Sequence, residues 1–127
     1  MKICVVDDDP IYQFSFGKIA SMIEPSLSTQ VYENGEIALN GLMAILESQE
    51  EIPEMVFLDL NMPVMDGWNF LDEFSKIHHD KGLSTKVYIV SSSVHQEDIQ
   101  RSKQYDIVEE YLVKPVPKRK LEDLLKK

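Results

Sequence analysis

Aspartates follow directly after two short apolar runs that lie far apart in the sequence. Asp7 and Asp8 follow the apolar residues 3–6, and Asp59 follows the stretch "MVFL". Two carboxylates about 4 Å apart near a protein surface repel each other by roughly 4 kcal/mol. A fold that brings the three together therefore calls for a cation. Carboxylate oxygens favour Mg²⁺, Mn²⁺ or Ca²⁺, and the sequence has no Cys/His cluster that would favour zinc.

Lys114 and Ser91 supply the other groups that a phosphoryl-transfer site requires. Mg²⁺ typically takes one or two carboxylates together with phosphate oxygens. Lys114 can neutralise a phosphoryl group as a point charge, and the hydroxyl of Ser91 can donate a hydrogen bond to one. The nucleotide-binding pattern GxxxxGK[ST] is absent from the sequence, so the nucleophile has to be a side chain. A carboxylate can take that role by forming an aspartyl phosphate.

Alternating strands and helices would place these side chains at one edge of a sheet. Apolar runs predict strands at 2–6, 29–33, 54–60, 86–90 and 109–113. Amphipathic stretches predict helices at 11–24, 36–48, 66–79, 95–105 and 117–127. This alternation predicts an α/β fold, a single doubly wound domain with a five-stranded parallel sheet and five helices on both faces. Ligands of such sheets bind outside the carboxyl ends of the strands, where the acids, Ser91 and Lys114 are expected.

The composition is that of one globular domain. The 127 residues contain a single cysteine, Cys4, and no apolar stretch approaches the roughly 18 residues of a membrane span. The chain also starts without the pattern of a signal peptide, so we expect a cytoplasmic protein without a membrane partner. The net charge of −9 argues against nucleic acid as a direct partner, because phosphate binding needs a basic face.

Four motifs together are more specific than any one of them. "VVDDDP", "FLDLNMPVMDG", "VSSS" and "YLVKP", in this order and spacing, resemble the receiver domain of two-component response regulators, of the chemotaxis-regulator type. The resemblance covers the whole chain and implies one receiver domain over 1–127, with the flavodoxin-like strand order 2-1-3-4-5. It implies a phosphorylation switch or phosphorelay shuttle that uses Mg²⁺. The phosphoryl donor would be a histidine kinase or histidine phosphotransfer protein, and the output a change in binding to a downstream protein target.

The resemblance also implies a role for each residue of the site. Asp59 would be the phosphoacceptor, and Asp8 a direct Mg²⁺ ligand, with Asp7 acting largely through water. The main-chain carbonyl of Asn61 would be a further metal ligand beside Asp59. Lys114 would pair with Asp59 or its phosphate, through a Lys114–Pro115 peptide that is expected to be cis.

A conformational switch is implied by two further positions. Ser91 occupies the position of the family's switch hydroxyl, and Tyr111 that of its switch aromatic. Phosphorylation would draw Ser91 towards the new oxygens and let Tyr111 turn inward. Asp9 is expected to cap the helix that follows it, and Asp66 to act as a turn or cap residue.

Ile11 and Phe14 lie three positions apart on the first predicted helix, off its inward face. Scattered surface hydrophobes are common, so these two side chains alone prove nothing. Their expected place close to Asp7 and Asp8 predicts a docking patch for the helices of the phosphodonor.

Two other function classes stay open for the sequence. A receiver-fold binding module that signals without phosphorylation would be marked by loss of Asp59 or Lys114, and both are present. A magnesium-dependent phosphatase acting on outside substrates typically has a second aspartate two positions after its nucleophile, where this chain has Asn61. We therefore expect no enzyme beyond the chain's own phosphorylation and dephosphorylation.

Overall fold

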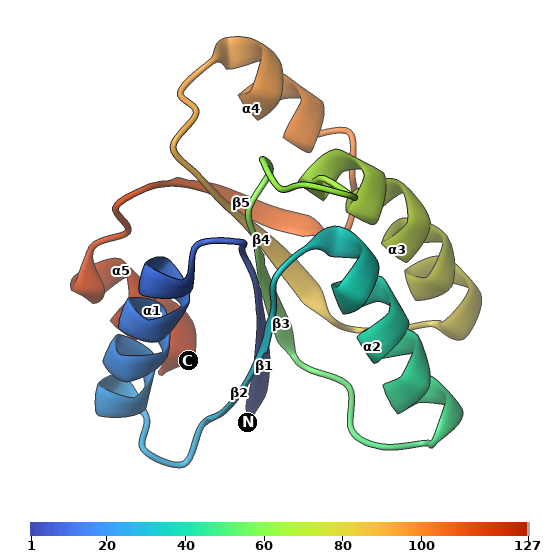
Figure 1. Ribbon diagram of the computed structural model, residues 1–127, viewed down its shortest axis with the longest axis horizontal. Helices are drawn as coiled ribbons and strands as arrows, with labels where there is room; N and C mark the ends of the chain where they lie inside the picture. Colours follow the sequence, from blue (N-terminus) through green and yellow to red (C-terminus); the bar gives the residue numbers. More distant parts are fainter. Residues whose placement is uncertain (127) are drawn as a thin grey trace.

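Five parallel strands form the sheet of the computed structural model, which describes residues 1–126 (Figure 1). The strands are β1 (Lys2–Val6), β2 (Ser28–Tyr32), β3 (Met55–Leu58), β4 (Lys86–Ser91) and β5 (Val108–Val113). Their order is β2-β1-β3-β4-β5, and every neighbouring pair is parallel. The predicted α/β class and strand order are confirmed.

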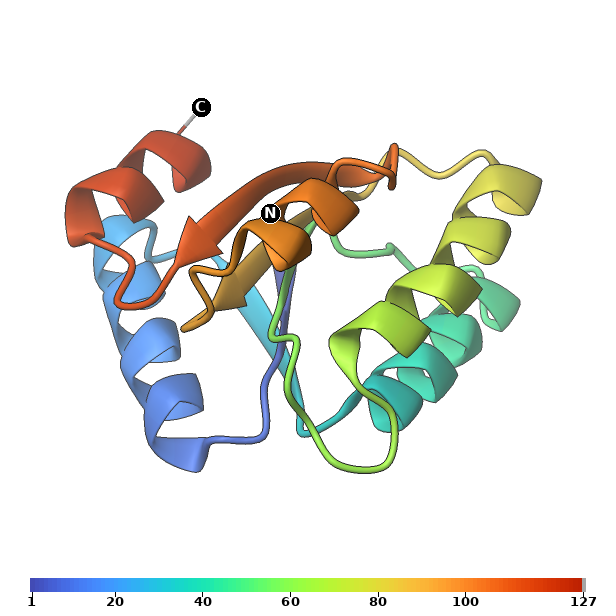
Figure 2. The ribbon, with the colours of Figure 1, turned by 90° about the horizontal axis from the view of Figure 1, so that it is seen from above.

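Helices cover both faces of this sheet, as Figures 1 and 2 show from two sides. On one face, α1 (Pro10–Ile23) packs beside α5 (Lys118–Leu125). On the other face, α2 (Gly35–Glu47) packs beside α3 (Gly67–Lys81). The short α4 (Gln96–Ser102) contacts β5 at the edge of the sheet. None of the helices in the described part of the chain is both long and apolar enough to cross a membrane.

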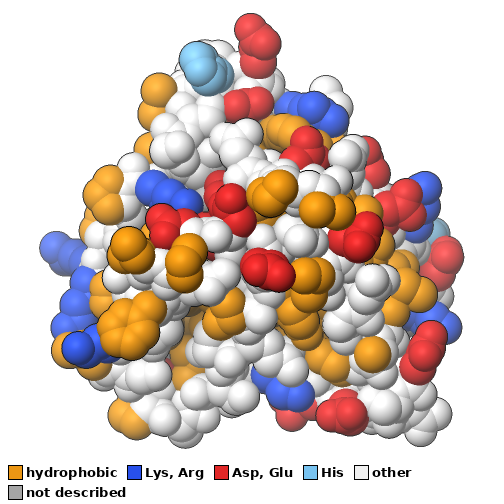
Figure 3. All heavy atoms as spheres, viewed as in Figure 1, with side chains coloured by type: hydrophobic (Ala, Val, Ile, Leu, Met, Phe, Trp, Pro, Cys, Tyr) orange, Lys and Arg blue, Asp and Glu red, His pale blue; other side chains and the backbone are white. Residues whose placement is uncertain are grey.

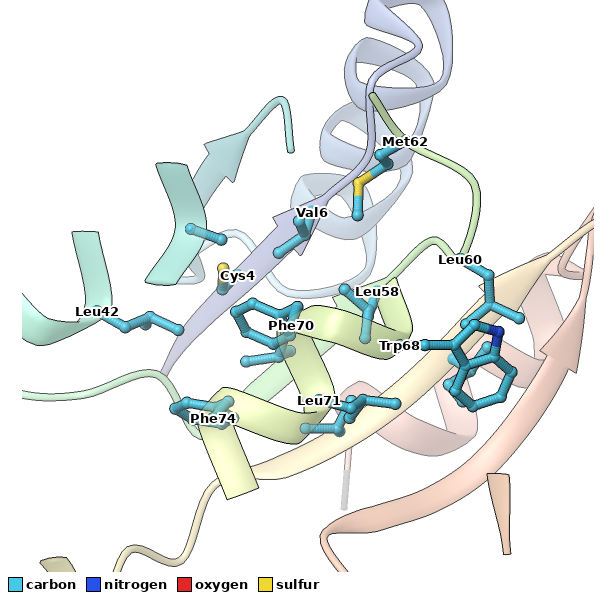
Figure 4. Packing of buried hydrophobic residues seen from close by; sticks show 14 of the residues in the cluster. Cys4, Val6, Leu42, Leu58, Leu60, Met62, Trp68, Phe70, Leu71 and Phe74 are labelled. Carbon is cyan, nitrogen blue, oxygen red and sulfur yellow. The ribbon is translucent and has the colours of Figure 1, made fainter. Parts of the chain in front are cut away.

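The alternation of side chains along the inner strands builds two apolar layers. Cys4 and Val6 of β1 point to the α2–α3 side, whereas Ile3 and Val5 point to the α1–α5 side. Figure 4 shows Phe70, Leu71 and Phe74 of α3 packed against Leu58, Val6 and other side chains of the first layer. Because both faces of β1, β3 and β4 are buried, their strands read as continuous apolar runs in the sequence.

The helices after β1, β2 and β3 begin at polar residues that cap them. Asp9 accepts a hydrogen bond from the Ile11 amide at 2.9 Å, and Asn34 accepts one from the Ile37 amide at 2.9 Å. Asp66 accepts from the amide of Asn69, also at 2.9 Å. The expected capping roles of Asp9 and Asp66 are therefore confirmed.

Three elements are shorter than the sequence predicts. The helix expected at 117–127 is α5, which begins after its N-cap Pro117 and ends at Leu125, and residue 127 lies outside the described residues. The strand expected at 54–60 ends at Leu58, because the Asp59 side chain accepts the Leu60 amide at 2.8 Å and the chain leaves the sheet. The helix expected at 95–105 ends at Ser102. After it, the amides of Lys103, Gln104 and Tyr105 bond to carbonyls three residues back, which tightens the chain into turns.

Candidate functional site: a carboxylate cluster at the carboxyl edge of the sheet

Three carboxylates meet where β1 and β3 end. One oxygen from each of Asp7, Asp8 and Asp59 lies within 4.8 Å of the others. Asp7 and Asp59 are buried, whereas Asp8 is exposed. The adjacent parallel strands β1 and β3 explain this meeting, since the Asp59 amide donates to the carbonyl of Val6 at 2.9 Å. The predicted convergence of remote acids is present in the structure.

Asp7 has both of its carboxylate oxygens engaged. Oδ1 accepts the Asp9 amide at 2.9 Å, and Oδ2 accepts from Lys114 Nζ at 2.9 Å. The side-chain amide of Gln13 donates to the Asp7 main-chain carbonyl. At 1% exposure, Asp7 is a fixed and almost fully desolvated member of the cluster.

Lys114 reaches the cluster from the end of β5. Its ammonium lies 2.9 Å from Asp7 Oδ2 and 3.8 Å from Asp59 Oδ2. Its main-chain amide donates to the Ser91 carbonyl at 2.8 Å, which ties the ends of β4 and β5 together. The Lys114–Pro115 peptide is cis, as expected. The Lys114 ammonium also lies 4.3 Å from the centre of the Tyr12 ring.

The loop that carries Asp59 is closed by a tight backbone contact. The amide of Gly67, the first residue of α3, donates to the Leu60 carbonyl at 2.9 Å. A Cβ at position 67 would lie 2.5 Å from the Asp59 carbonyl oxygen and 2.8 Å from Leu60 Cα. Only glycine permits this close approach of the two backbone segments. Gly67, the glycine of the "DG" in the sequence motif, therefore helps to hold Asp59 in place because it has no side chain.

Burial and the neighbouring Asp7 charge raise the pKa of Asp59 above its ordinary value. Lys114 and the backbone amides of Leu60 and Asn61 act in the opposite direction and only partly offset the rise. Burial and both carboxylates also raise the pKa of Tyr12 to about 12, so its phenol stays neutral. An excess of negative charge therefore marks the pocket, and it is the charge that a divalent cation would neutralise.

The raised pKa of Asp59 predicts that the cation-free protein loses stability as the pH rises. The folded state binds this proton more tightly than the unfolded chain, whose pKa is near 3.8. The stabilisation is therefore complete below that value and is lost as the pH climbs through the raised pKa. Denaturation at a series of pH values in a chelator should show this fall in the free energy of unfolding, and Asp59→Asn should lack it. Identical pH profiles for the two proteins would contradict the prediction.

The candidate switch residues Ser91 and Tyr111 both bond to Ser93. The fully buried hydroxyl of Ser91 accepts the Ser93 amide at 3.1 Å, and the Tyr111 hydroxyl donates to the Ser93 carbonyl at 2.9 Å. The Ser93 side chain in turn donates to Asp98 of α4 at 2.6 Å. One residue of the β4–α4 loop thus links both candidates to α4.

The other predicted residues are exposed, in the loop after Asp59 and on α1. Asn61 is exposed in the loop after Asp59, and Ile11 and Phe14 are 77% and 72% exposed on α1. On the face drawn in Figure 3, hydrophobic side chains gather over α1 next to acidic ones. The expected exposure of Ile11 and Phe14 is therefore present. His78 is half-buried, and its ring bonds to the Thr85 carbonyl at 2.8 Å.

Sequence reasoning missed an aromatic cluster between α3 and α4, defined by Trp68, Asp72, Arg101 and Tyr105. The Arg101 guanidinium lies 4.5 Å from the centre of the Trp68 ring, and the Trp68 and Tyr105 rings stack at 6.0 Å. The Tyr105 hydroxyl donates to Asp72 at 2.6 Å.

Comparison with known proteins agrees with this geometry. The family model described as response regulator receiver domain matches residues 3–126. The nitrate/nitrite response regulator protein NarL of Escherichia coli (strain K12) is 33% identical over 97 residues, which are 76% of this chain and 40% of NarL. The probable C4-dicarboxylate response regulator DctR of Bacillus subtilis (strain 168) is 29% identical over 126 residues, 99% of this chain and 51% of DctR. The chain thus matches about half of the length of these relatives or less.

A solved structure gives the same result for the fold. A two-component response regulator from Cytophaga hutchinsonii superimposes with a TM-score of 0.87 at 26% sequence identity. The match covers 98% of this chain and 93% of that one.

Proposed function

The chain belongs to the response regulator receiver domain family, and from that premise we propose that Asp59 accepts a phosphoryl group from a phosphohistidine in a Mg²⁺-dependent reaction. The receiver would then change conformation and alter its binding to a downstream protein. The proposal covers residues 1–127 as one receiver domain.

One observation carries the choice of Asp59 as the nucleophile. Asp7 has both oxygens held by Lys114 and the Asp9 amide, and Asp8 lies exposed at the rim. Asp59 Oδ1 accepts the Leu60 amide, but Oδ2 lies 3.8 Å from Lys114 Nζ, too far for a hydrogen bond. Asp59 is therefore the buried carboxylate of the cluster that keeps an oxygen free to attack phosphorus.

The donor atoms of the pocket fit Mg²⁺. Asp8 and Asp59 would bind it directly, with Asp7 acting through water and the Asn61 carbonyl as the remaining protein ligand. When bound, Mg²⁺ would offset the carboxylate charge and that of the incoming phosphoryl oxygens. Few ligands from the protein suit this ion, because it keeps waters and takes phosphate oxygens.

In the proposed transfer, Asp59 Oδ2 forms a bond to phosphorus as the bond from phosphorus to the histidine nitrogen breaks. The histidine keeps the electron pair of the broken bond and takes up a proton. Lys114 lies beside Asp59 Oδ2, where its ammonium can neutralise an oxygen of the transferring group. Charge neutralisation and positioning are therefore what this chain's residues contribute.

The switch would use Ser91 and Tyr111. The Ser91 hydroxyl accepts the Ser93 amide, so its own proton remains for donation to phosphate oxygens on Asp59, and a move of the side chain towards those oxygens would draw the hydroxyl away from Ser93. Release of Ser93 would weaken its bonds to Tyr111 and Asp98, and so free both the aromatic ring and α4. Phosphorylation would shift the population from one conformation to the other. The size of the shift would be set by the difference between the free energies with which the phosphoryl group interacts with the two conformations.

The partner that donates phosphate would be a histidine kinase or histidine phosphotransfer protein that docks on Ile11 and Phe14. These exposed side chains lie on the first half of α1, which starts just after Asp7 and Asp8. We place this exchange in the cytoplasm, without nucleic acid or membrane as a direct partner of the chain.

Replacement of Ile11 and Phe14 by alanine should slow transfer from a phosphorylated histidine protein at least about tenfold, since interface anchors contribute roughly 1–2 kcal/mol each. Phosphorylation by the small donor acetyl phosphate should not change, because no docking is involved. Met22→Ala is the matched control, since Met22 is 62% exposed at the far end of the same helix. Equal slowing by all three substitutions, or slowing with acetyl phosphate, would contradict the docking patch.

The test of the proposed function is intact-protein mass spectrometry after treatment with acetyl phosphate. The chain should gain one phosphoryl group in Mg²⁺ and none when a chelator replaces Mg²⁺. Absence of modification in Mg²⁺ would favour the alternative, a receiver-fold binding module that signals without phosphorylation.

A further inference from the structure

Tyr12 is the only aromatic residue, among those that the structure describes, whose ring faces the Lys114 ammonium. It lies on the first turn of α1 and is half-buried between the carboxylate cluster and the α1–α5 core. Its ring tilts against Phe16 at a centroid distance of 6.1 Å. We propose that the Tyr12 ring is a positioning residue, which holds the Lys114 ammonium between Asp7 and Asp59 through a cation–π contact.

The geometry supports a role beyond packing. Lys114 Nζ bonds to Asp7 Oδ2 at 2.9 Å, lies 3.8 Å from Asp59 Oδ2, and lies 4.3 Å from the Tyr12 ring centre. The Lys114 side chain is 20% exposed, so these three groups account for much of what the ammonium can contact. A cation within about 6 Å of a ring centre is attracted to its negative face.

An aromatic ring can restrain the Lys114 ammonium, which is a point charge at the end of a flexible side chain. Asp7 alone would draw the ammonium close and hold it away from Asp59. The Tyr12 ring attracts the same ammonium without donating or accepting a proton, so it restrains the side chain and leaves its protons for the carboxylates. The ammonium then stays within reach of phosphoryl oxygens on Asp59, in keeping with the proposed function on which this inference rests.

The contact belongs to this chain's own α1 sequence. None of the four sequence motifs includes Tyr12, and its neighbours Ile11 and Gln13 point elsewhere: Ile11 is exposed, and the Gln13 amide bonds to the Asp7 carbonyl. Tyr12 lies on the apolar face of α1 and packs against the α1–α5 core. A leucine at this position would serve equally well for packing. The difference between an aromatic and an aliphatic side chain separates the two roles.

The experiment compares Tyr12→Phe, Tyr12→Leu and Tyr12→Met with the wild type. The first readout is the NMR shift of the Lys114 Cε protons, which the ring current of an aromatic neighbour displaces. We expect the displacement in wild type and Tyr12→Phe, and its loss in Tyr12→Leu and Tyr12→Met. This readout needs no phosphorylation, and amide spectra of the same samples report that each variant is folded.

The second readout is the rate of phosphorylation by acetyl phosphate in Mg²⁺. Tyr12→Leu and Tyr12→Met should react about tenfold more slowly, the rate equivalent of a partly desolvated cation–π contact. Tyr12→Phe should stay within about twofold of wild type, because it keeps the ring face. In a Lys114→Met background, Tyr12→Leu should have no further effect, since the two residues act as a unit.

The outcomes separate this inference from the proposed function. A wild type that takes no phosphate overturns the proposed function and, with it, the role of Tyr12 in transfer. A wild type that is phosphorylated, with Tyr12→Leu and Tyr12→Phe slowed equally, overturns the inference alone. Additive effects of Tyr12→Leu and Lys114→Met also overturn it, because they would show that Tyr12 acts without the ammonium.

Discussion

Asp59→Asn is expected to abolish phosphorylation of the chain by acetyl phosphate. Asparagine keeps the size and the oxygen of the side chain, but a neutral amide is a poor nucleophile for phosphorus. It also removes one of the carboxylates that would bind Mg²⁺. Intact-protein mass spectrometry should therefore find one phosphoryl group on the wild type and none on the variant.

Two further proteins control for this result. Asp80→Asn changes an exposed carboxylate in the last turn of α3 and should be phosphorylated like the wild type. Asp8→Asn should keep the nucleophile but react more slowly and need more Mg²⁺, because it removes a proposed metal ligand. A phosphoryl group retained by Asp59→Asn would assign the acceptor to another residue and refute the proposed chemistry.

Gly67→Ala is expected to lower the free energy of unfolding by about 2–3 kcal/mol, at the upper end of the range for overpacked sites. The new Cβ would lie 2.5 Å from the Asp59 carbonyl oxygen and 2.8 Å from Leu60 Cα. Both are backbone atoms, so the clash cannot be relieved by a side-chain rotation. The loop would have to shift, and Asp59 with it, so we also expect slower phosphorylation. Urea denaturation measures the first effect and acetyl phosphate kinetics the second.

Gly17→Ala provides the opposite case within the same chain. Gly17 lies inside α1, and a Cβ there would meet nothing within 4 Å. Alanine should therefore raise the free energy of unfolding by up to about 1 kcal/mol through its higher helix propensity. Tolerance of Gly67→Ala would show that the Asp59 loop is not held by close packing, and destabilisation by Gly17→Ala would contradict the open space around Gly17.

Much of the fold and the site could be predicted because their determinants are local. Buried strands such as β1 and β3 are continuous apolar runs, and Asp9, Pro10 and Asp66 are residues that begin helices. A parallel sheet then carries the residue after each strand to the same edge. This is why Asp7 and Asp59 could be paired across the sequence before their separation was known.

The missing parts depend on side chains that meet across the fold. The contact between Tyr12 and Lys114 joins α1 to the end of β5, and no periodicity distinguishes Tyr12 from any other inward residue of its helix. The half-buried place of His78 likewise depends on a bond to Thr85, just before β4, which the pattern of its own helix does not reveal. The end of α4 was misplaced because i to i+3 backbone bonds, not a proline or glycine, terminate it.

The aromatic cluster of Trp68, Asp72, Arg101 and Tyr105 makes the two ends of α4 mechanically unequal. Its last turn is held to α3 through Arg101, whereas its first turn is held by the Ser93–Asp98 hydrogen bond, which the proposed switch would release. A rod fixed at one end rotates about that end. We therefore expect α4 to respond to events at Ser93 as a lever with its pivot near Arg101, so that its tip sweeps the widest arc. A downstream protein that distinguishes the two conformations is therefore expected to bind the start of α4, near Gln96, where the displacement is largest.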